Sequence, residues 1–232
     1  MLSPADYALW LVGSLLEAIA LVCAIRARAF KRYFTLVFYL AASFALGIGR
    51  YWILTHFGYA SHQYLYFFYY SDALLTICLY FTLMGLYSHV FRDLGASKYV
   101  RLGGMLLLAG TALISYAMVA NSDAKGYLVT RAIVELSQNL YFVGMLLTYV
   151  LWGAMMKSKE NRTRLMQLVL ALGVYFSAYA ASYALRNLHW QWDVWRFVVH
   201  LMSDWLPVAW AYTFLKVPED ARLATARLVP HR

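Results

Sequence analysis

Apolar residues in this chain fall into seven separate blocks, each about as long as a helix that spans a lipid bilayer. The blocks cover residues 7–25, 33–54, 66–91, 100–120, 128–155, 163–185 and 194–215. A transmembrane helix needs about 20 mostly apolar residues. Hydrophobic residues make up 63% of the chain and charged residues only 13%, and no block is left over for a soluble domain. The sequence therefore predicts an all-α fold, a single-domain bundle of seven transmembrane helices.

Lysine and arginine are distributed unequally between the two sides of this predicted bundle. Fifteen of the 20 basic residues lie in the loops after the first, third and fifth blocks, within two residues of those loops, or in the tail 216–232. Cytoplasmic loops carry such an excess, so we expect the N-terminus outside, the C-terminus inside and the cell (inner) membrane as the location. These cytoplasmic loops account for the net charge of +9, so we do not expect a nucleic acid as a partner. The basic cytoplasmic face could instead dock a protein partner.

The chain also carries signs of an internal repeat. Asp72 and Asp204 each follow a serine, and each precedes leucine, tyrosine and leucine by two, eight and eleven residues. Arg50 and Arg186 end the second and sixth blocks in the same way. Many transporters are built from repeats of this kind. The pattern predicts two parallel three-helix units, residues 7–91 and 128–215, linked by a helix over 100–120.

The seventh block combines charged residues with a proline. Arg196, His200 and Asp204 are spaced four residues apart and therefore share one helix face. Pro207 follows Asp204 by one turn, where it removes a backbone donor and favours a kink. A charge at the bilayer centre costs at least about 2.5–3.5 kcal/mol, so an ionisable residue at that depth indicates a functional site.

Charged and polar residues recur in other blocks, which predicts a polar core open to the outer side. We expect eight residues to bind a ligand there: Arg50, Asp72, Arg131, Glu135, Asn139, Arg196, His200 and Asp204. A second interpretation is that opposite charges pair in the core and only pin the helices together. His200 in particular could relay protons, or could pack with a hydrogen bond to Asp204.

Aromatic residues gather on the predicted outer side and on the sixth block. Residues 64–70 read YLYFFYY, which is typical of an aromatic belt at the membrane interface and would also suit the mouth of a pocket. Tyr175, Tyr179 and Tyr183 form a stripe at helical spacing. Such tyrosines usually serve packing, but they would line a pocket if the stripe faces the polar core.

Several chemistries find no support in the sequence. There is no HExxH, GxSxG or phosphate-binding glycine loop. The six histidines show no metal-binding spacing, and no lysine lies inside a predicted span to form a retinal Schiff base. Cys23 and Cys78 fall within spans as packing residues. We therefore expect no enzymatic activity, no cofactor and no metal.

Three functions remain compatible with this pattern. The leading hypothesis is a transporter-like protein whose polar core binds or passes a small polar or amphiphilic ligand. The alternatives are a receptor-like sensor that signals through a partner, and an accessory structural subunit of a membrane complex. The hypotheses differ in whether Asp72 and Asp204 face a common cavity or separate helix contacts.

Overall fold

A computed structural model describes residues 4–91, 97–120, 128–157, 162–187 and 194–219, without the side chains of residues 4–6, 97–98, 100–101, 128, 186–187 and 194–200. Each predicted block forms one helix, with ends shifted by at most four residues. The elements are α1 (Pro4–Arg26), the 3₁₀ helix η1 (Ala29–Lys31), α2 (Phe34–Phe57), α3 (His62–Val90), α4 (Ser97–Ala120), α5 (Leu128–Lys157), α6 (Thr163–Asn187) and α7 (Val194–Lys216).

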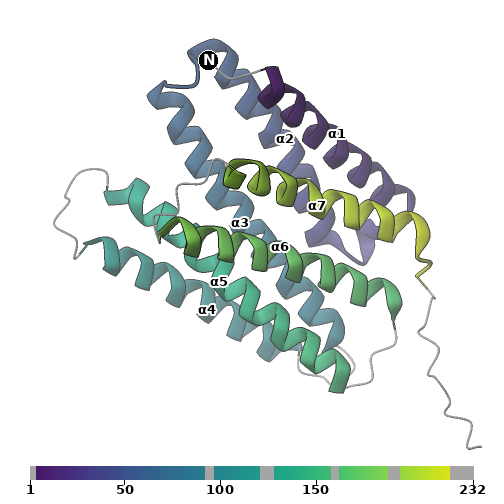
Figure 1. Cartoon of the computed structure of the whole chain (residues 1–232). Helices are drawn as coiled ribbons and strands as arrows, with labels where there is room; N and C mark the ends of the chain where they lie inside the picture. The colour runs from purple at the N-terminus through teal and green to yellow at the C-terminus, as the bar shows by residue number, and fades with distance from the viewer. Residues whose placement is uncertain (1–3, 92–96, 121–127, 158–161, 188–193, 220–232) are drawn as a thin grey trace, which may run out of the picture.

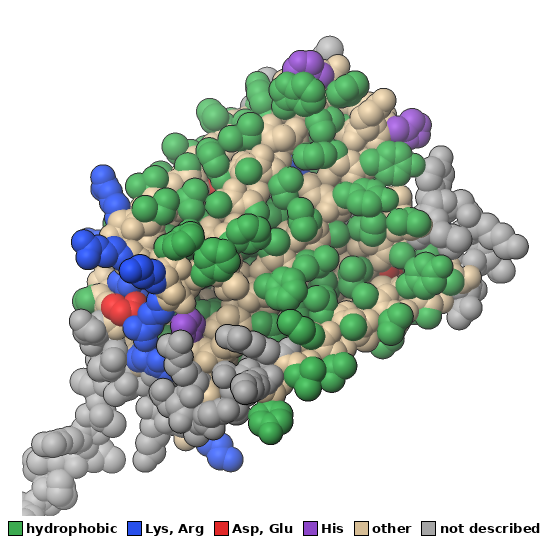
Figure 2. Space-filling model, turned by 180° about the vertical axis from the view of Figure 1, so that it is seen from behind, with side chains coloured by type: hydrophobic (Ala, Val, Ile, Leu, Met, Phe, Trp, Pro, Cys, Tyr) green, Lys and Arg blue, Asp and Glu red, His purple; other side chains and the backbone are tan. Residues whose placement is uncertain are grey.

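The length and apolarity of the helices suit a bilayer. At a rise of about 1.5 Å per residue, even the shortest helices reach roughly 35 Å, against a hydrocarbon core of about 30 Å. Helices α1 to α6 are long and apolar enough to cross a membrane. Hydrophobic side chains also cover the flank of the bundle that Figure 2 shows. The chain is a multi-pass helical membrane protein.

Six of the helices form a ring, and one lies outside it (Figure 1). Around the ring, α1 packs against α2, α2 against α3, α3 against α5, α5 against α6, α6 against α7, and α7 again against α1. Helix α4 packs outside this ring, against α5 and α3. A hydrogen bond holds α4 in this position: the Tyr80 hydroxyl of α3 donates to the Gly104 carbonyl of α4 at 2.8 Å. The six ring helices therefore surround a common interior.

The two ends of the bundle differ in chemistry. Lysine and arginine gather at one end (Figure 2), which we call the basic end. The described members are Arg26, Arg28, Lys31, Arg32, Lys157, Arg162, Arg164 and Lys216. The opposite end, which includes the turn 58–61 between α2 and α3, is called the aromatic end. Gly58 makes this turn with φ of 81°, a value that favours glycine, and Ser61 caps α3 by accepting from the Tyr64 N–H at 3.1 Å.

Glu219 ties three segments together at the basic end. Its carboxylate pairs with Arg32 at 3.0 Å and with Arg164 at 2.8 Å. It also accepts a hydrogen bond from the Tyr33 hydroxyl at 3.2 Å. Arg164 is buried and donates from Nε to the Val217 carbonyl at 2.8 Å. The segment after α7 is thereby fixed to the start of α6 and to the connection between α1 and α2.

Candidate functional site

A cavity of about 930 Å³ lies inside the ring, in the half of the bundle nearer the aromatic end. Every ring helix contributes to it, whereas α4 supplies none of the described lining residues. Towards the basic end, the interior is filled by packed side chains such as Leu83, Leu168 and Trp210, each at most 1% exposed. We call this space the central cavity. It reaches Tyr59 in the turn at the aromatic end and ends on a closed apolar core.

Three carboxylates from three helices line the central cavity: Glu17 of α1, Asp72 of α3 and Asp204 of α7. Glu17 accepts a hydrogen bond from the Ser43 hydroxyl at 2.5 Å. Asp204 lies against α1, where a Cβ on Gly13 would come within 2.9 Å of its Oδ1. A glycine at position 13 therefore makes room for this carboxylate.

The Asp72 carboxylate has no direct partner in the described part of the chain. No hydrogen bond or ion pair within 4.0 Å joins it to another described side chain. A buried charge without a protein partner is costly, and it persists where it meets water or a ligand. Asp72 and Asp204, the two aspartates of the predicted repeat, thus line one common cavity.

Arg50 is the only basic residue among the described residues that line the central cavity. Its Nε donates to the Ser71 hydroxyl at 2.7 Å, and its guanidinium lies over the Phe68 ring at 4.6 Å from the centroid. It is near enough to Glu17 and Asp72 to interact electrostatically with both. Arg50 is therefore oriented by α3 and makes no ion pair with a described carboxylate.

Aromatic side chains form much of the remaining wall. Trp10 of α1 stacks on Tyr51 of α2, with ring centroids 4.6 Å apart. On α6, Tyr179 and Tyr183 both line the cavity. Tyr141, which is buried, stacks on Tyr179 at 4.8 Å. The tyrosine stripe of α6 thus contributes to the cavity wall as well as to packing.

The aromatic segment 64–70 is divided between two environments. Tyr64, Phe68 and Tyr69 line the central cavity. Tyr66 and Tyr70 lie on the other side of α3, where they are 38% and 45% exposed and outside the lining. The segment therefore supplies one face of α3 to the cavity wall, and the interfacial belt on the other face stays a prediction.

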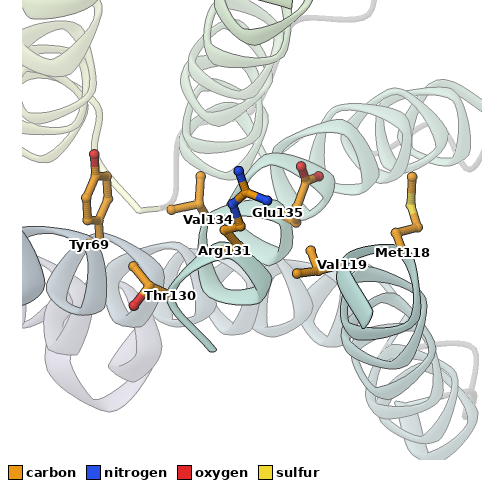
Figure 3. A pocket seen from close by; sticks show the side chains of 7 residues that line it. All are labelled: Tyr69, Met118, Val119, Thr130, Arg131, Val134 and Glu135. Atoms are coloured by element: carbon orange, nitrogen blue, oxygen red, sulfur yellow. The ribbon is translucent and has the colours of Figure 1, made fainter. Parts of the chain in front are cut away.

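A smaller cavity of about 570 Å³ adjoins the central one between α3, α4 and α5. It holds Arg131 and Glu135, whose side chains project from successive turns of α5 towards the same space (Figure 3). Tyr69 and Val134 line both cavities. The single polar core that we expected is thus divided, with Arg131 and Glu135 in a side compartment.

Asn139 lies at a helix contact. Its Nδ2 donates to the Ser115 hydroxyl of α4 at 2.9 Å. Arg131 and Glu135 lie on the same side of α5, since their cavity is lined by Met118 and Val119 of α4. The side chains of Arg196 and His200 lie outside the described residues. Of the eight expected ligand-binding residues, Arg50, Asp72 and Asp204 meet in the central cavity.

The structure adds residues to the site that the sequence did not single out. Ser137 of α5 is 2% exposed and lines the central cavity, yet its hydroxyl has no hydrogen-bond partner among the described residues. Buried polar atoms are nearly always satisfied, so this hydroxyl is available to bind a ligand in the cavity. A lone serine in an apolar helix carries no signal of this kind in the sequence. The Glu17 carboxylate, by contrast, was visible as a charge within a span.

No protein-family model matches the chain, and no curated protein or solved structure is detectably similar to it. In the part of the chain that the structure describes, no group of three or more His, Cys, Asp or Glu side chains is placed to hold a metal ion. The functional argument therefore depends on the geometry and charge of the central cavity.

Proposed function

We propose that this protein binds a small polar or amphiphilic ligand in the central cavity and passes it across the membrane. The observation that carries the proposal is that Asp72 and Asp204, from α3 and α7, line one cavity together with Arg50. Charges that only pinned helices together would pair directly across helix contacts. Here the carboxylate of Asp72 faces open space instead, as expected of a group that meets a ligand.

The proposal includes a membrane orientation. With α7 counted as the seventh span, the N-terminus is outside, the basic end faces the cytoplasm of the cell, and the central cavity opens outward. The excess of lysine and arginine at the basic end supports this orientation. Packed residues close the cavity on that side, which corresponds to an outward-facing state of a transporter. In this account the protein is not an enzyme.

The hydration of the cavity can be tested with single cysteines. Leu75 lies on α3 within the lining of the central cavity, while Leu113 of α4 is 70% exposed on the outer surface of the bundle. Each is replaced by cysteine in a Cys23→Ala/Cys78→Ala background. The neutral reagent 2-hydroxyethyl methanethiosulfonate reacts with thiolates in water. We expect rapid modification at position 75 and slow modification at position 113, where the thiol faces lipid.

The outcome separates a ligand site from a purely structural core. Modification at position 75 at a rate near that of a cysteine at Ala60, in the exposed turn, supports a cavity open to solutes. A rate at position 75 as low as that at position 113 would show that the cavity is closed to small molecules and would contradict the proposal.

A further inference from the structure

We infer that the central cavity selects an organic cation with an apolar body. The inference rests on the proposed function and specifies the class of ligand. Among the described lining residues, three carboxylates, Glu17, Asp72 and Asp204, stand against one guanidinium, that of Arg50. If Arg196 is counted from the sequence, the carboxylates still outnumber the guanidinium groups by three to two. A site with excess negative charge attracts a cation and repels an anion.

The positive charge of Arg50 is already engaged by the protein. Its Nε donates to Ser71, and its guanidinium covers the Phe68 ring. A second guanidinium nitrogen lies 3.5 Å from the Phe68 carbonyl. An anionic ligand at the remaining N–H groups of Arg50 would meet the nearby carboxylates of Glu17 and Asp72. A cation needs only the carboxylate of Asp72, with which no described side chain pairs.

The aromatic wall provides the second element of recognition. Tyr64, Tyr179 and Trp10 line the same cavity as the carboxylates. The face of an aromatic ring attracts a cation, with about 0.5–1 kcal/mol at exposed sites and about 2 kcal/mol when the pair is desolvated. The same rings cover the apolar part of a ligand. Carboxylates and aromatic faces together bind alkyl- and arylammonium groups better than they bind sugars or anions.

The buried hydroxyl of Ser137 points to an occupant independently of the charges. It lines the cavity, it is almost fully buried, and no atom of the described residues forms a hydrogen bond with it. A cavity of about 930 Å³ also exceeds what a few waters would fill, and it lies in the size range of sites for small organic molecules.

The inference can be tested by measuring the binding of benzyltrimethylammonium to the purified full-length protein in neutral detergent. Benzenesulfonate, an anion that also carries a phenyl ring, is the control ligand. Affinity is read from the rise in melting temperature with probe concentration. We expect binding of the cation and not of the anion. Asp72→Asn should raise the dissociation constant for the cation about tenfold or more, because a charged contact is lost. Arg50→Gln should lower it several-fold, because a like charge is removed.

Opposite effects of these two substitutions distinguish ligand contact from general damage, which would weaken binding in both. A second pair of variants keeps the test valid if one of the charge variants fails to fold. Tyr64→Leu should weaken cation binding about two- to fivefold, and Tyr66→Leu, on the other face of α3, should leave it unchanged. Equal binding of cation and anion, no binding of either, or the same direction of change in Asp72→Asn and Arg50→Gln would overturn the inference. Modification of a cysteine at position 75 would then still support a ligand cavity of another specificity.

Discussion

Single glycine residues set how closely the helices of this bundle approach. A Cβ at Gly144 of α5 would lie 2.5 Å from Cε1 of the Phe176 ring on α6. Phe176 is fully buried, so the ring has no room to move away. At Gly110 of α4, by contrast, an added Cβ would meet no atom within 4 Å. Two glycines in two apolar helices therefore have different roles, which only their surroundings reveal.

This difference predicts opposite effects of the same substitution. Gly144→Ala should destabilise the protein by about 1–3 kcal/mol, because the methyl group overpacks the contact between α5 and α6. Gly110→Ala should stabilise it by about 0.5–1 kcal/mol, because alanine favours the helix. Unfolding in detergent, followed by circular dichroism, measures both. If both variants shift stability in the same direction, the packing at Gly144 is described wrongly.

At the same scale, the sequence singled out part of the cavity wall, while the binding of a ligand there stays a prediction. Charges within apolar spans are conspicuous, and Arg50, Asp72 and Asp204 indeed line one cavity. The side compartment of Arg131 and Glu135 could not be predicted from the sequence. Helix periodicity shows which residues share a face, but it does not show which helix packs against that face. Arg131, Glu135 and Asn139 follow one another at intervals of four residues, and all three lie on the side of α5 that adjoins α4.

The helices themselves were predicted closely, because a bilayer imposes both their length and their apolarity. What could not be read from the pattern is how the segment after α7 is held. Glu219 lies beyond the last helix, in a region that the sequence presents only as a short basic tail. The structure instead places its carboxylate between Arg32 and Arg164. Contacts between residues 32, 164 and 219 depend on the order of helices around the ring.

The pair of buried Arg164 and partly exposed Glu219 should contribute measurably to stability. Removing one partner of a fully buried ion pair costs roughly 3–5 kcal/mol, and because Glu219 is 28% exposed we expect the lower end, about 3 kcal/mol. Arg164→Gln should therefore lower the melting temperature by about 6–12 °C at roughly 2–4 °C per kcal/mol. Lys157→Gln, which removes an exposed charge at the same end, should change it by less than about 2 °C. Equal melting temperatures for the two variants would contradict the role of the pair.

At the scale of the whole molecule, the order of helices follows from short connections between sequential antiparallel helices. In this ring α3 adjoins α5 and α7 adjoins α1. Two parallel three-helix units related by a twofold axis would produce the same neighbours, with α4 as the linker outside the ring. The repeat remains a prediction, and the cavity that Asp72 and Asp204 share is compatible with it.

The orientation of the bundle can be checked by labelling in intact cells with an impermeant thiol reagent. Cysteines at Arg28 and Lys157, at the basic end, should be protected, and a cysteine at Ala60, at the aromatic end, should react. The excess of lysine and arginine at the basic end is the physical reason for this expectation. Permeabilised cells provide the control, because all three positions should then react. Labelling at position 157 in intact cells would reverse the orientation.

The central claim is that the Asp72 carboxylate serves a ligand and does not hold the helices together. The melting temperature of Asp72→Asn in detergent without ligand tests it most directly, with Arg164→Gln as the measure of a buried pair. Because Asp72 has no described partner in the protein, its neutralisation removes a costly charge. We predict a melting temperature within about 2 °C of the parent protein or above it. A fall as large as that of Arg164→Gln would show that Asp72 is a structural residue and would contradict the account.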